Sequence, residues 1–137
     1  MSERTITSVP EGGARVTAVV RGHTVVTDQP VHAGGGDAAA MPLELLGAGL
    51  ATCAALYAQQ FCVTRNIAVD GLRVEVDTEH AKAPKRITRF ELRVQLPAAL
   101  PAEYQDAIER AVRGCPVFNT LQLPTEIDLQ LLRTADV

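Results

Sequence analysis

The chain has no tryptophan and few other aromatic residues: two tyrosines and three phenylalanines among 137 residues. Its apolar material is aliphatic and small, since 47% of the residues are hydrophobic and only 4% are aromatic. A chain of this length and hydrophobic content predicts one globular domain over residues 1–137 with a core of small side chains. The first residues contain no apolar run of the kind that a signal peptide needs, so we expect a cytoplasmic protein.

Runs of basic residues are also missing. The net charge is −3, and the lysines and arginines are scattered along the chain. Because binding to nucleic acid or to an anionic membrane needs concentrated positive charge, we expect neither partner. No CxxC, HExxH or nucleotide-binding fingerprint occurs, and the three histidines, His80 among them, fall at turns or strand ends. We therefore expect no metal site and no cofactor.

The N-terminal part of the chain predicts a hairpin and a loop. β-Branched residues alternate over 15–21 and 23–28, and the glycine between them places Arg21 at a tight turn. Residues 1–13 are expected to be loosely ordered. Three consecutive glycines within 32–41 indicate a mobile loop.

A long apolar helix is predicted from Pro42 to about Asn66. Proline suits the first helical position, and Glu44 in the first turn suits the helix dipole. The stretch 45–58 is apolar or small all round, so we expect this helix to be buried on every side, against another helix or a second subunit. These fourteen residues are fewer than the ~20 that a membrane span needs.

The remaining elements complete an α+β pattern. Residues 72–80 and 85–96 alternate with period two and predict two strands. Apolar side chains follow one face of an amphipathic helix over 102–114, and 125–132 alternates again as a strand. The sum is an α+β fold in which helices pack on antiparallel sheets.

Three cysteines are the candidates for reactive chemistry: Cys53, Cys62 and Cys115. On an ideal helix Cys62 faces away from Cys53 at about 13 Å, which is beyond disulfide reach. Cys115 is then the only cysteine that could pair with Cys53, and it stands at a helix end, where the backbone can rearrange. The alternative is that all three are small buried hydrophobes, and Cys62 is expected to be core packing in either case.

A thiol that reduces peroxides must be ionised at neutral pH, so a cation must lower its pKa. Cys53 lies in the middle of the predicted helix, too far along for the helix dipole to help. An arginine is the natural supplier of this charge because it is always ionised and its guanidinium is fork-shaped.

The segments PLELLGAGLATC and CPVFNTL, with DQP and GGGD before them, resemble the OsmC/Ohr family of thiol-dependent hydroperoxide reductases over residues 14–132. The resemblance implies an OsmC-like fold, with antiparallel sheets wrapped around a long buried central helix, in an intertwined homodimer with active sites at the subunit interface. It implies that Cys53 attacks an organic hydroperoxide and becomes a sulfenic acid. Cys115 would then close a Cys53–Cys115 disulfide, which lipoyl groups or small dithiols reduce.

Two further positions are compared with the family less directly. The arginine that the family places at the turn of its N-terminal hairpin corresponds to Arg21, with Arg15 as the alternative. Its glutamate directly after the helix-start proline is replaced here by Leu43. Glu44 is one residue further on, about 180° around an ideal helix from Cys53, and is a poor substitute as a supporting residue.

Three functions remain open from the sequence. The first is a two-cysteine peroxidase, which the cysteine pair favours. The second is a small-molecule-binding or redox-sensing protein of the same fold, which Leu43 favours, and the third is a structural dimerisation protein. The expected substrate pocket is apolar and consists of side chains on or near the Cys53 helix face and one beside Cys115: Leu46, Leu50, Tyr57 and Phe118.

Overall fold

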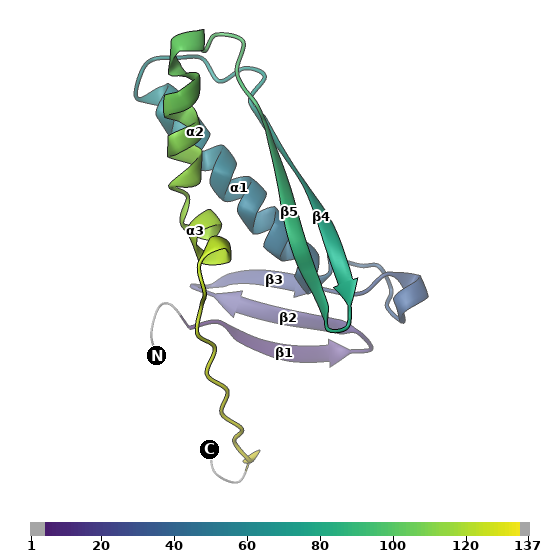
Figure 1. The fold of residues 1–137 in the computed structure, drawn as a ribbon. Coiled ribbons are helices and arrows are strands. Elements are labelled where there is room, and N and C mark those ends of the chain that lie inside the picture. Colours follow the sequence, from purple (N-terminus) through teal and green to yellow (C-terminus); the bar gives the residue numbers. More distant parts are fainter. Residues whose placement is uncertain (1–4, 135–137) are drawn as a thin grey trace. The chain divides into compact units, whose positions relative to one another are not determined.

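The computed structural model describes residues 5–134, and Figure 1 shows the order of its elements. The chain divides into two compact units. Within the described residues, the first unit contains everything up to Ala51 together with Glu75–Arg93, and the second contains Thr52–Val74 and the residues from Val94 onward. The expectation of a single domain over 1–137 stays a prediction.

The first unit begins with an antiparallel sheet of three strands in the order β1 (Thr7–Gly12), β2 (Arg15–Val20) and β3 (His23–Thr27). The predicted hairpin is present, with Val20 paired to His23 across the turn.

The expectation that residues 1–13 are loosely ordered is wrong for β1, which pairs with β2 along its length. Pro10 and Gly12 hid this strand from the sequence reading, and the pairing register shifts between them. An edge strand such as β1 tolerates a proline because its outer amides need no partner strand. Residues 1–4 lie outside the described part of the chain.

The glycine-rich segment after β3 is irregular, as predicted, but it is held by a buried carboxylate. Asp28 is only 3% exposed and accepts backbone N–H bonds from Gln29 at 2.7 Å, Gly36 at 3.3 Å and Ala38 at 3.0 Å. A side chain on Gly35 would collide with the backbone of Gln29, so this glycine is required by a close approach. The segment also includes the short 3₁₀ helix η1 (Val31–Ala33).

Helix α1 (Pro42–Val63) confirms the predicted long helix, although it ends three residues earlier than expected. In the single chain it is not buried on every side. The buried residues follow one side, while apolar side chains elsewhere on the helix remain about half exposed. The buried ones are Leu50, Ala54, Ala58, Phe61 and Cys62, and the exposed ones include Leu46, Leu56 and Val63. The physical reason for the difference is that one chain provides too few elements to cover a helix from all directions.

By length and composition alone, α1 could also cross a bilayer. The whole helix has 22 residues, whereas the sequence analysis considered only the apolar stretch 45–58. Helices from protein cores pass the same test, so this property is weak evidence for a membrane span.

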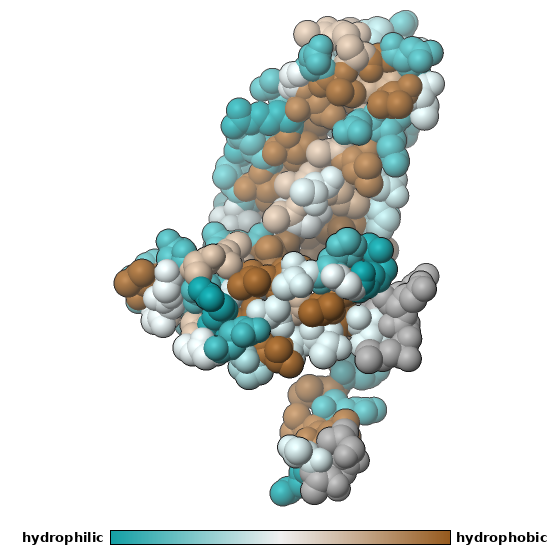
Figure 2. All heavy atoms as spheres, turned by 180° about the vertical axis from the view of Figure 1, so that it is seen from behind, coloured by the Kyte–Doolittle hydropathy of each residue, from teal (hydrophilic) through white to brown (hydrophobic). Residues whose placement is uncertain are grey.

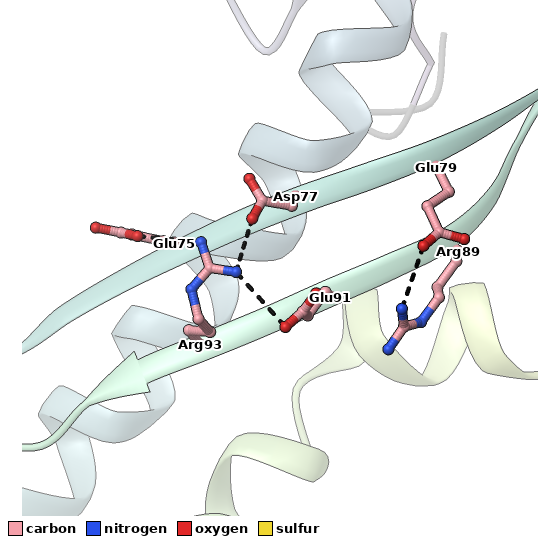
Figure 3. A network of polar contacts seen from close by, with 6 residues as sticks. All are labelled: Glu75, Asp77, Glu79, Arg89, Glu91 and Arg93. Carbon is pink, nitrogen blue, oxygen red and sulfur yellow. Dashed lines mark hydrogen bonds and ion pairs between the residues drawn. The ribbon is translucent and has the colours of Figure 1, made fainter.

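The strands β4 (Arg73–Lys82) and β5 (Lys85–Gln95) form a two-stranded sheet close to the predicted ranges. One face of this hairpin is charged (Figure 3). Arg93 contacts Asp77 at 2.7 Å and Glu75 at 3.1 Å, and the hydrogen bond that it donates to Asp77 is the main reason why the pKa of Arg93 is raised. These side chains are about half exposed, so each pair contributes little to stability, and this face is a solvated one.

The second unit contains the second half of α1, the 3₁₀ helix η2 (Ala102–Tyr104), α2 (Gln105–Arg113) and α3 (Pro116–Gln122). The predicted helix over 102–114 corresponds to η2 and α2, and Ile108 on its buried face is 1% exposed. The Tyr104 ring packs edge-on against Phe61 with centroids 5.9 Å apart, and the Arg65 guanidinium lies 3.6 Å above the Phe61 ring. The sequence reading missed α3.

The prediction of a strand over 125–132 is wrong for the single chain, where this segment has no regular structure. Its alternating apolar side chains are almost fully exposed: Ile127 by 90%, Leu129 by 83% and Leu131 by 89%. A period-two pattern forms a strand only where a neighbouring strand can accept its backbone hydrogen bonds, and within the described residues this segment pairs with none.

Candidate active site

The two cysteines expected to react are brought together in the second unit. Cys53 lies in the middle of α1, and Cys115 lies between α2 and α3. Gly114 ends α2, and Pro116 then occupies the first position of α3, which makes Cys115 the N-cap residue of that helix. Both thiols are free and share a hydrogen bond.

The first turn of α3 also donates backbone hydrogen bonds to both sulfurs. The N–H of Val117 bonds to Cys53, and the N–H of Phe118 bonds to the Cys115 sulfur at 3.5 Å. The sequence contained a signal for this arrangement, because a residue directly before a helix-start proline is an N-cap, and N-cap side chains accept from the second or third helical amide. We did not predict these amide contacts.

The surroundings of Cys53 favour the thiol over the thiolate. Burial raises the pKa of Cys53, the hydrogen bond that it donates to Cys115 raises it further, and the N–H of Val117 lowers it. Among the described residues of the second unit, no cation contributes to this shift. Activation of Cys53 therefore needs a positive charge closer to its sulfur than any that contributes in the single chain.

Arg21 stands where the sequence predicted, at the β2–β3 turn, and belongs to the first unit. Its φ of 49° and the φ of 78° at Gly22 are both positive, as in the type I′ turn that suits two-residue hairpins. An arginine in this conformation costs roughly 1–2 kcal/mol relative to a glycine. Arg15, the alternative cation, begins β2, where its charge helps to lower the pKa of Asp28 after the stronger effects of the backbone amides of Ala38 and Gln29.

Glu44 has a structural role at the start of α1. Its carboxylate accepts the backbone N–H of Met41 at 2.9 Å, which is the bond that a glutamate at the third helical position makes to its own N-cap residue. Leu43, which replaces the family's glutamate, is half-buried.

The residues expected to form the substrate pocket lie in both units. Leu46, half exposed, and the buried Leu50 belong to the first. Tyr57 and Phe118 belong to the second and are half-buried, and Phe118 is joined to the thiol pair through its backbone. Their grouping into one pocket stays a prediction.

Cys62 is fully buried, and burial raises its pKa, in keeping with a core residue. Within the described residues, no group of three or more His, Cys, Asp or Glu side chains could hold a metal ion. His80 is exposed and lies near the end of β4, as predicted, and its ring shares a 2.8 Å hydrogen bond with Thr78; both residues line a pocket.

Comparison with known proteins identifies a family and a fold. The family model described as OsmC-like protein matches residues 34–130. A Psychrobacter arcticus protein described as an osmotic stress induced and detoxification response protein shares 24% identity with this chain. Its TM-score is 0.74, and 88% of each chain is covered. A Legionella pneumophila organic hydroperoxide resistance protein shares 20% identity, with a TM-score of 0.58, and 89% of this chain and 92% of that one are covered. An OsmC-like hydroperoxide resistance protein from Jannaschia shares 26%, with a TM-score of 0.57 and coverages of 89% and 84%. No curated protein matches the chain.

Proposed function

The chain belongs to the OsmC-like family, and from this membership we propose that it is a two-cysteine thiol peroxidase that reduces organic hydroperoxides to alcohols. The hydrogen-bonded pair of Cys53 and Cys115 carries the proposal. Cys53 is half-buried, whereas Cys115 is 0% exposed. This difference supports an attack on the peroxide by Cys53 and a resolving role for Cys115.

The reaction proceeds in three balanced steps. The Cys53 thiolate attacks one oxygen of the hydroperoxide, the O–O bond breaks, the departing alkoxide takes a proton and leaves as the alcohol, and Cys53 becomes a sulfenic acid. The Cys115 sulfur then attacks the sulfenic sulfur, and water leaves as the disulfide forms. A lipoyl group or small dithiol reduces this disulfide and becomes a disulfide itself, which supplies the two electrons that the peroxide consumed.

We assign the activation of Cys53 to Arg21. The pKa of Cys53 is raised in the single chain and no cation is among the causes of the shift, so the proposed reaction requires a cation closer to its sulfur. Arg21 holds an unfavourable backbone conformation for its residue type, and such strain is found most often at functional sites. The family's paired carboxylate is replaced here by Leu43, so Arg21 lacks that partner.

We also propose a homodimer as the working form. Half-exposed Leu46, Leu56 and Val63 on α1 need a cover that one chain does not supply, and hydrophobic side chains occupy much of the face shown in Figure 2. Val9, Val19 and Val26 share one face of the three-stranded sheet by register and are also exposed. A reducing compartment would keep the thiols free, and the cytoplasmic location stays a proposal.

The second candidate is a non-catalytic or redox-sensing small-molecule-binding protein. Leu43 in place of a carboxylate and the raised pKa of Cys53 favour it. In that case Cys53 would be oxidised slowly and without preference among peroxides.

The test is intact mass and peptide mapping of the reduced protein after one equivalent of cumene hydroperoxide or hydrogen peroxide. We expect a rapid loss of two hydrogens that maps to a Cys53–Cys115 disulfide and is faster with the organic peroxide. Cys115→Ser should stop at a Cys53 sulfenic acid that dimedone traps. Arg21→Gln should slow the oxidation about 100-fold, as the loss of one strong electrostatic contact does.

Cys62→Ser is the matched control and should behave like the unchanged protein. The peroxidase assignment fails if both thiols stay reduced, or if oxidation is equally slow with both peroxides. That outcome supports the second candidate.

A further inference from the structure

A pocket in the first unit lies between the N-terminal turns of α1 and the β4–β5 hairpin. Its volume is about 690 Å³, within the ~300–1,000 Å³ typical of small-molecule sites. All of its lining residues belong to the first unit, and no cysteine is among them. The lining of the pocket therefore does not include the thiols of the proposed peroxidase chemistry.

The walls of this pocket are apolar and built from small residues on the helix side. Leu43, Gly47, Ala48 and Ala51 line it from α1, and Val76 and Ile87 line it from the hairpin. A Cβ atom on Gly47 would lie 4.0 Å from the Val76 Cγ1 atom, an ordinary contact, so the missing side chain leaves usable space. Such walls suit an alkyl chain.

Toward the hairpin end the lining becomes polar and then basic. The lining side chains of β4 change from Val76 to the hydrogen-bonded pair Thr78 and His80. Three positive side chains close to the hairpin turn also line the pocket: Lys82, Lys85 and Arg86. The pocket therefore has an apolar part and a cationic end.

One carboxylate also lines the pocket. Glu44 would repel an anion, but its carboxylate already accepts the N–H of Met41. Three cationic side chains against one hydrogen-bonded carboxylate leave the pocket with net positive charge, which favours a ligand with an anionic head.

We propose that this pocket binds a long-chain carboxylate. The carboxylate pairs with Lys82, Lys85 and Arg86, and the alkyl chain lies against the apolar walls formed by α1 and the hairpin. The inference goes beyond the proposed peroxidase, because binding requires neither thiol.

The test uses the fluorescence of cis-parinaric acid and of its methyl ester with the full-length Cys53→Ser protein, in which Cys53 cannot react. The acid should bind more tightly than the ester. The combined variant Lys82→Gln/Lys85→Gln/Arg86→Gln should weaken binding of the acid more than about tenfold, since one charge-assisted bond is worth roughly 1.5–3 kcal/mol. It should leave binding of the ester unchanged.

Two matched controls separate the pocket from general effects of charge and size. Arg89→Gln removes a positive charge from the outer face of the same hairpin and should leave the affinity unchanged. Gly47→Leu fills the pocket and should abolish binding of acid and ester, whereas Gly49→Leu, at a position where a Cβ meets nothing within 4 Å, should not.

Equal binding of acid and ester, or equal affinity of the triple variant and Arg89→Gln, would overturn the proposal. If Gly47→Leu changes the oligomeric state measured by sedimentation and leaves probe binding intact, a second copy of the chain covers the pocket, and the ligand proposal is wrong. Because Cys53→Ser is used throughout, these results do not depend on whether the peroxidase proposal holds.

Discussion

At the scale of single residues, Asp28 organises the loop that precedes α1. Backbone N–H groups, chiefly those of Ala38 and Gln29, hold the pKa of its carboxyl below the ordinary value of 3.8. A carboxyl with a lowered folded pKa stabilises the fold above its unfolded pKa, and the contribution is lost as the pH falls through the folded value. We expect Asp28→Asn to be less stable than the unchanged protein at neutral pH, with the gap closing below pH 3.8. Urea midpoints measured across this range check it, and a gap that stays constant would contradict it.

At the scale of elements, α2 depends on its buried face. Ile108 is 1% exposed and lies one helical turn after Tyr104, whose ring packs against Phe61 of α1. Ile108→Ala should lower the free energy of unfolding by about 2–5 kcal/mol, through lost burial and the cavity left behind. The exposed neighbour Arg110→Ala is the control and should change it by no more than about 0.5 kcal/mol. Equal effects in denaturant titrations would show that α2 is not held by this face.

At the scale of the whole molecule, the segment 125–132 is the observation that most favours the proposed homodimer. Its side chains alternate, and the apolar set is nearly fully exposed in the single chain. The three-stranded sheet ends in β1 and β3, and edge strands such as these can accept a further strand. We propose that the segment pairs with an edge strand of the partner.

The combined change Ile127→Asp/Leu129→Asp should therefore weaken dimerisation at least about 100-fold, because it places two charges on the face that the partner would bury. Gln130→Asp, on the other face of the alternation, is the matched control and should leave the dimer intact. Sedimentation velocity over a range of concentrations distinguishes the two. The pairing proposal is wrong if the unchanged protein is a monomer, or if both changes affect dimerisation equally.

The sequence predicted elements whose signals are local. Gly22 between two β-branched runs was enough for the β2–β3 hairpin, and Pro42 before an apolar stretch was enough for the start of α1. The strand β1 was missed because Pro10 and Gly12 interrupt its alternation, and only its pairing with β2 shows it. The glutamate at position 44 was considered for catalysis, and the structure instead shows it bonded to the N–H of Met41.

By itself, the sequence determined the family resemblance, the α+β class and most of the helices and strands, because motifs and periodicity are properties of neighbouring residues. Only the tertiary structure decided that Cys53 and Cys115 share a hydrogen bond and that the N–H of Val117 bonds to the Cys53 sulfur. It also brought the basic end of the β4–β5 hairpin and the first turns of α1 together around one pocket. These arrangements join residues that are tens of positions apart, and no local pattern specifies how such segments meet in space.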